Sequence, residues 1–252
     1  MLLEEENNIN NIEQSEPLLN ENKPVQHEIA LWKRIVLFLV GLAGIFVIGI
    51  FVGLLTFFAP EELRDPITNL VTYAVLFVSL IAIVLVDIPH YLATFKKWQS
   101  YLMGLAVGIG IIVFDMIYTT ILVSCYPDYT IGGNETAVRG VIDVYPFWSV
   151  LILGIVGPIC EEITYRIGLF GSLRKVNRIL AYAVSTIVFA LIHFRFNAPN
   201  IYVELANFPA YFVSGLALAF AYDKWGFTGS MTAHIANNLY AVMASIIVKY
   251  IH

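Results

Sequence analysis

Long apolar segments restrict the fold of this chain more than any other feature. A helix needs about 20 mainly apolar residues to cross the hydrocarbon core of a bilayer. The segments that meet or approach this length are Ile35–Ala59, Ile67–Ile88, Tyr101–Ser124, Phe147–Phe170, Ile179–Phe194, Ile201–Tyr222 and Ser230–Tyr250. Because 59% of the residues are hydrophobic and only 13% are charged, a water-soluble globular fold is disfavoured. The sequence predicts an all-α, polytopic transmembrane bundle of about seven to eight helices, the eighth being a re-entrant or amphipathic element.

The start of the chain has a different composition. Residues 1–28 are rich in Asn, Glu and Gln and contain few apolar side chains. Such a segment cannot bury enough apolar surface to order itself. We therefore predict a disordered cytoplasmic tail at 1–28 and a transmembrane domain at 29–252. No basic region followed by a short apolar stretch opens the chain, so we expect no cleavable signal peptide.

Lysine and arginine are distributed unequally between the two ends of the predicted helices. If the amino-terminus is cytoplasmic, the cytoplasmic side holds Lys23, Lys33, Arg34, Lys96, Lys97, Arg174, Lys175, Arg178 and Lys224, and the opposite side holds Arg64, Arg139, Arg195 and Lys249. This excess follows the positive-inside rule. We predict a multi-pass protein of the cell membrane with a cytoplasmic amino-terminus. The lipid bilayer is its first expected partner, and the net charge of −5 suggests no nucleic-acid partner.

Charged residues interrupt the fourth predicted span. Glu161, Glu162 and Arg166 lie within it, where a charged side chain costs several kcal/mol and therefore usually marks function. On a helix Glu162 and Arg166 share a face, whereas Glu161 points about 100° away from Glu162. One carboxylate can thus be paired and structural while the other acts as a general base. The alternative is a buried ion-pair cluster that only holds helices together.

Two further predicted spans carry histidines. His193 ends the fifth span, and the seventh holds His234 and Asn238, which are four residues apart and share a face. A single histidine in an apolar helix is more often a packing residue, but the glutamate pair makes catalysis the better explanation here. Glu, two His and Asn together can activate a water molecule and stabilise an oxyanion, as peptide hydrolysis requires. Asp115, in the third span, is a candidate without an assigned role.

The depths of these residues constrain this hypothesis. From the cytoplasmic helix ends, Glu161 and His193 lie about 15–20 Å deep by helix rise, and His234 only about 5–10 Å. Tilted helices or a late helix start must close this difference. A separation of more than about 10 Å among the three side chains would prevent a shared water and rule out hydrolysis.

Three motifs resemble those of the CAAX protease and bacteriocin-processing (CPBP, or Abi) family of membrane endopeptidases. They are Glu161-Glu162 with Arg166, Phe189 with His193, and His234 with Asn238, within a core at about 147–245. The resemblance implies a helical bundle in which Glu161 and His193 activate water and His234 and Asn238 stabilise the oxyanion. Glu162 and Arg166 would support the site. It further implies a membrane-associated protein or peptide substrate, prenylated or a peptide precursor.

No cofactor is favoured, because no HExxH sequence of the zincins occurs in the chain. Zinc is the alternative, with Glu161, His193 and His234 as its three ligands. Two other classes of function remain open from the sequence. One is an ion or solute transporter, since intramembrane Glu, Arg and His can form an ion path. The other is a family member without catalysis that acts as a membrane scaffold or bacteriocin immunity factor.

Overall fold

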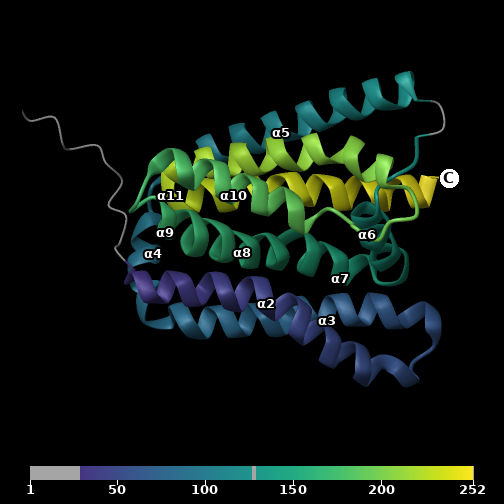
Figure 1. The fold of residues 1–252 in the computed structure, drawn as a ribbon, viewed down its shortest axis with the longest axis horizontal. Helices are drawn as coiled ribbons and strands as arrows, with labels where there is room; N and C mark the ends of the chain where they lie inside the picture. Colours follow the sequence, from purple (N-terminus) through teal and green to yellow (C-terminus); the bar gives the residue numbers. More distant parts are fainter. Residues whose placement is uncertain (1–28, 127–128, 252) are drawn as a thin grey trace, which may run out of the picture.

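Helices make up the regular secondary structure of residues 29–126 and 129–251, the part of the chain that the computed structural model describes (Figure 1). The tail predicted at residues 1–28 lies outside the described residues. Five helices are long and apolar enough to cross a membrane by length and composition. The prediction of an all-α membrane helix bundle is therefore confirmed.

The first three predicted spans are long helices that each begin a few residues before the predicted start. They are α2 (Leu31–Leu55), α3 (Glu61–Val84) and α5 (Trp98–Cys125). Short helical turns prolong the first two, η1 at Thr56–Phe58 and η2 at Leu85–Asp87. Pro60 immediately precedes α3, a position that tolerates proline because the first N–H groups of a helix have no partner within it. The short helix α4 (Ile88–Thr94) joins α3 to α5.

The fourth span, Pro146–Leu173, alternates between α and π geometry. Its segments are α7 (Pro146–Leu151), η3 (Ile152–Val156, a π-helix), α8 (Gly157–Glu161), η4 (Glu162–Phe170, a π-helix) and α9 (Gly171–Leu173). Pro158 offers a reason for the first irregularity, because proline has no N–H to donate back along the helix. The glutamate motif lies at the junction of α8 and η4. Short π segments inside helices are frequent at functional sites.

The fifth predicted span corresponds to α10 (Arg178–Ile192), and the sixth and seventh correspond to the two arms of α11 (Ile201–Ile251). Helix α10 is short, with Asn177 accepting a hydrogen bond from Leu180 N–H as its amino-terminal cap. Helix α11 is interrupted at Gly226, whose φ of 69° is in the region that favours glycine. Figure 1 shows the chain reversing there, so residues 201–225 and 227–251 run antiparallel. The amphipathic element expected in addition to the spans is α6 (Gly133–Val144).

Glycines let α5 and α11 approach closely. A Cβ on Gly104 would overlap the backbone oxygen of Gly229, and one on Gly108 would overlap that of Ala233. Farther along α5, Tyr118 donates to the backbone oxygen of Ala206 at 2.8 Å. Helix α5 therefore contacts both arms of α11. Small residues are the usual means by which membrane helices gain packing contacts without a hydrophobic driving force.

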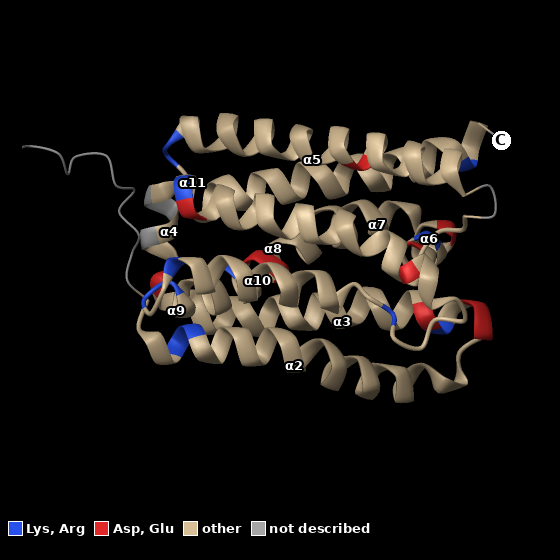
Figure 2. Ribbon diagram, turned by 45° about the horizontal axis from the view of Figure 1, so that its top comes forward, with Lys and Arg blue, Asp and Glu red and all other residues tan. Residues whose placement is uncertain are grey.

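Charged residues gather at the two ends of the bundle, apart from residues in α5 and near α8 (Figure 2). At the end where α2 begins, Lys33 binds Asp87 at 2.8 Å. At the same end Asp223 of α11 is paired with Arg174 and Arg178. The apolar body between the two ends contains Asp115, Glu161, Glu162 and Arg166.

Candidate active site

Glu162 and Arg166 form a fully buried ion pair. Arg166 Nε lies 3.3 Å from Glu162 Oε2, and neither side chain has any exposed surface. The guanidinium also lies over the ring of Phe189, 4.9 Å from its centroid. The pairing that the four-residue spacing predicted is thus present. Its two opposite charges compensate one another inside the bundle.

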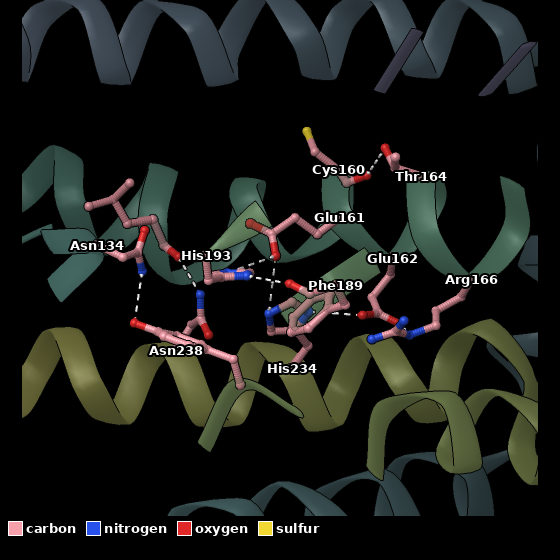
Figure 3. Close-up of polar contacts among 12 residues, drawn as sticks. Asn134, Cys160, Glu161, Glu162, Thr164, Arg166, Phe189, His193, His234 and Asn238 are labelled. Atoms are coloured by element: carbon pink, nitrogen blue, oxygen red, sulfur yellow. Dashed lines mark hydrogen bonds and ion pairs between the residues drawn. The ribbon is translucent and has the colours of Figure 1, made fainter. Parts of the chain in front are cut away.

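His234 lies between the two glutamates. Its Nδ1 is 2.9 Å from Glu162 Oε1, and its Nε2 is 3.7 Å from Glu161 Oε2 (Figure 3). Since a carboxylate oxygen accepts hydrogen bonds, Nδ1 carries the proton in the contact with Glu162. This hydrogen bond fixes the orientation of the imidazole ring and directs Nε2 toward Glu161. The two adjacent carboxylates therefore face the two nitrogens of one ring.

His193 presents its second nitrogen to the same oxygen. Its Nδ1 donates to the backbone oxygen of Phe189 at 2.8 Å, which leaves Nε2 3.9 Å from Glu161 Oε2. The ring stacks on Tyr211 at a centroid distance of 4.8 Å and an interplanar angle of 21°. Because a carbonyl only accepts, this contact places the proton on Nδ1 and leaves Nε2 able to accept one.

Three groups therefore converge on one point. Glu161 Oε2 has no hydrogen-bond partner among the described residues, and both imidazole Nε2 atoms lie within 4 Å of it. Distances of 3.7 and 3.9 Å exceed a direct hydrogen bond and suit groups that share a water molecule. The side chains of Glu161 and His193 are 12% and 16% exposed, against 0% for Glu162, so the first glutamate is the more accessible of the two. The depth difference inferred from helix rise does not separate the three side chains.

Asn238 makes a different contact from the other motif residues. Gly157 N–H bonds to Ile152 O at the five-residue spacing of a π-helix. By the same spacing, the next carbonyl, that of Leu153, would need an N–H from residue 158, which is proline. Asn238 Nδ2 donates to this carbonyl at 3.2 Å (Figure 3). The motif asparagine therefore stabilises the irregular helix that carries Glu161.

One contact to Glu161 was not anticipated from the sequence. The hydroxyl group of Tyr73, in α3, donates to Glu161 Oε1 at 3.2 Å. A tyrosine in an apolar span has no distinguishing neighbour pattern, so the sequence held no signal for this role. Asp115, the candidate left without a role, has a buried Oδ1 without a hydrogen-bond partner in the described part of the chain.

The three residues predicted as alternative zinc ligands are not arranged as a metal site. Within residues 29–126 and 129–251, no group of three or more His, Cys, Asp or Glu side chains has an arrangement that could hold a metal ion. Glu161, His193 and His234 thus fall outside such a set, and no chemical step is assigned to zinc. Both cysteines, Cys125 and Cys160, are free.

Comparisons with known proteins identify similar sequences. Residues 143–240 match the family model described as type II CAAX prenyl endopeptidase Rce1-like. The protein printed as "Putative membrane peptidase YdiL" of Bacillus subtilis is 32% identical over 92 residues, 36% of this chain and 34% of that protein. The UPF0177 protein YxdF of Lactococcus lactis is 33% identical over 113 residues, 41% of this chain and 59% of that protein.

A third similar protein comes from Mycoplasma capricolum and is described only as an uncharacterized protein. It is 25% identical over 170 residues, 63% of this chain and 48% of that protein. The matches therefore span less than two thirds of each of these relatives. No solved structure matches the chain. The family match contains all three motifs, and it confirms the resemblance that they indicated: over residues 143–240 this multi-pass membrane protein is similar to the type II CAAX prenyl endopeptidase Rce1-like family.

Proposed function

We propose that this protein is an intramembrane endopeptidase that hydrolyses a peptide bond with a water molecule activated by Glu161. The observation that carries the proposal is the convergence of His193 Nε2 and His234 Nε2 on Glu161 Oε2, at 3.9 and 3.7 Å. The family match supports protease activity at the level of the family. The glutamate mechanism is inferred from the arrangement of the side chains.

The first step is proton removal from water. A water molecule between Glu161 Oε2 and His193 Nε2 can donate one O–H to each, since both atoms are free to accept. As the water oxygen attacks the substrate carbonyl carbon, its proton moves to the Glu161 carboxylate. Collapse of the tetrahedral intermediate then breaks the C–N bond, and this proton passes to the leaving amine. The carboxylate is regenerated, so no external proton is consumed.

The oxyanion that forms in this step needs hydrogen-bond donors. His234 supplies Nε2–H when its ring is protonated, a form that the carboxylate of Glu162 stabilises from the Nδ1 side. Asn238 has two amide hydrogens and uses one for the Leu153 carbonyl, so the second can point toward the oxyanion. Arg166 keeps Glu162 ionised, and this ion pair supports His234 from outside the reacting atoms.

The substrate follows from the location of the site. Glu161 lies inside a membrane-spanning helix, so its substrate is a membrane-associated protein or peptide that reaches this depth. A prenylated protein and a peptide precursor both meet this condition. We also infer a cytoplasmic amino-terminus from the excess of cations on that side. Bacteriocin immunity is one biological role consistent with such an activity.

The decisive experiment measures cleavage of membrane-tethered and prenylated peptides by the purified protein in liposomes. We expect wild type to cleave, and Glu161→Gln and His193→Ala to lose at least about 100-fold in kcat, the usual contribution of a general base. The matched control is Glu135→Gln, which alters an exposed glutamate paired with Arg139. A chelator should leave the rate unchanged. Loss of cleavage with chelator would restore the zinc hypothesis, and full activity of Glu161→Gln would refute the mechanism.

A further inference from the structure

The two oxygens of Glu161 have different surroundings. Oε1 accepts a hydrogen bond from the Tyr73 hydroxyl group at 3.2 Å, whereas Oε2 faces the two imidazoles without a hydrogen bond among the described residues. The terminal torsion of a glutamate is broad and roughly two-fold, so packing or a hydrogen bond must decide which way the carboxylate faces. Tyr73 supplies such a hydrogen bond.

The ring of Tyr73 is itself held in place. The ring packs against two apolar clusters of the core, one that contains Ile163 and one that contains Leu153. The Cys160 thiol also donates to the backbone oxygen of Tyr73 at 4.0 Å, within the range of a hydrogen bond from sulfur. Helix α3 is therefore attached to α8 both through the ring of Tyr73 and through its backbone.

We propose that Tyr73 is a positioning residue for Glu161, supplied by a helix that lies outside the segment matching the family. Its hydroxyl group fixes Oε1, so that Oε2 faces His193 and His234, and stabilises the ionised carboxylate that must accept the proton of water. This role rests on the proposed function of Glu161 as general base. The orientation itself exists whether or not the protein is a protease.

Two histidines and one ion pair lie close to Glu161. His193 and His234 face it from the end of α10 and from α11. On its own helix, Glu162 is paired with Arg166 and directed at His234 Nδ1. The contacts of Glu162 with Arg166 and His234 do not involve the Tyr73 hydroxyl group, so Tyr73→Phe removes the hydrogen bond to Glu161 Oε1 and leaves the buried ion pair in place.

The first test needs no substrate. Dicyclohexylcarbodiimide adds to protonated carboxyl groups in apolar surroundings and gives a stable N-acylurea, which mass spectrometry locates by residue. We would measure the rate of labelling of Glu161 at one slightly alkaline pH in the full-length protein in liposomes, with Glu161→Gln confirming the labelled position. Removing the donor should raise this rate about tenfold in Tyr73→Phe, because a hydrogen bond to Oε1 favours the ionised carboxylate, which the reagent does not attack.

The matched control is Tyr118→Phe. Tyr118 also donates a hydrogen bond inside the bundle, to the backbone oxygen of Ala206, but on a different helix from Tyr73. The labelling rate of Glu161 in Tyr118→Phe should equal that of wild type. An unchanged labelling rate in Tyr73→Phe would overturn the proposal, as would an equal increase in Tyr118→Phe, which would indicate a general structural effect.

The second test uses cleavage. We expect Tyr73→Phe to lower kcat about tenfold with little change in KM. A rise in KM with kcat unchanged would assign Tyr73 to substrate binding and refute the positioning role. The two tests distinguish the positioning role of Tyr73 from the proposed function of Glu161. If Glu161 is labelled faster in Tyr73→Phe but cleavage does not depend on Glu161, the contact with Tyr73 stands and the protease mechanism is rejected.

Discussion

Two ion pairs of the same spacing lie in very different surroundings, and their comparison gives a sharp prediction. Glu162 and Arg166 are both 0% exposed, whereas Glu135 and Arg139 are 39% and 49% exposed. Replacing Arg166 by Met leaves the Glu162 charge buried without its partner, which costs about 3–5 kcal/mol. Replacing Arg139 by Met removes a solvated pair and costs about 0.2–1 kcal/mol.

A double variant separates the charge from the packing. In Glu162→Gln/Arg166→Met both charges of the buried pair are removed. The glutamine oxygen can still accept a hydrogen bond from His234 Nδ1, and the methionine side chain can still pack against the Phe189 ring. Replacement of a whole buried pair is often neutral or stabilising. We therefore expect the double variant to be more stable than Arg166→Met by at least about 2 kcal/mol.

The measurement is the free energy of unfolding in mixed micelles of a mild detergent and increasing sodium dodecyl sulfate, followed by circular dichroism and tryptophan fluorescence. The variants Arg166→Met, Arg139→Met and the double variant would be compared with wild type at one pH. A loss in free energy of unfolding for Arg166→Met that is no larger than the loss for Arg139→Met would show that breaking the buried pair does not leave an uncompensated charge on Glu162. That result would refute the electrostatic reasoning.

Two further predictions concern glycines and use the same assay. Gly226→Ala should lower the free energy of unfolding by about 1–3 kcal/mol, because a side chain at φ 69° is strained at the point where α11 reverses. Gly104→Ala should cost about 1–3 kcal/mol, since its Cβ would overlap the backbone oxygen of Gly229 and force α5 away from α11. Gly110→Ala, on the same helix with nothing within 4 Å of its Cβ, is the control and should leave stability unchanged or raise it by up to about 1 kcal/mol, because alanine is the better helix former. Equal effects at Gly104 and Gly110 would contradict the close-packing argument.

The apolar segments predicted the bundle because helix formation in a bilayer depends on local composition. Hydrogen bonds inside each helix satisfy the backbone without help from other segments, so length and hydropathy suffice to find a span. The same local regularity predicted that Glu162 and Arg166 would pair, since residues four apart share a face. It also predicted two separate spans after residue 200, which correspond to the two arms of α11 on either side of the reversal at Gly226.

Contacts between helices were determined only by the tertiary structure. The partners of Glu161 come from α3, from the end of α10 and from α11, and their meeting depends on the rotation and depth of each helix. No periodic pattern in the chain encodes these two quantities, which is why the motif histidines could be named as candidates while Tyr73 could not. The π segment before Pro158 likewise gave Asn238 a backbone partner that ideal helix geometry would not have exposed.

The sequence by itself thus determined the chemical groups available and the helices that carry them. The tertiary structure decided which imidazole nitrogen faces Glu161, which of its oxygens is held by Tyr73, and which carboxylate is closed off by Arg166. The physical reason is range. Helix geometry is fixed by hydrogen bonds within a few residues, whereas single contacts in the site join residues up to 88 positions apart in the chain, brought together by the packing of whole helices.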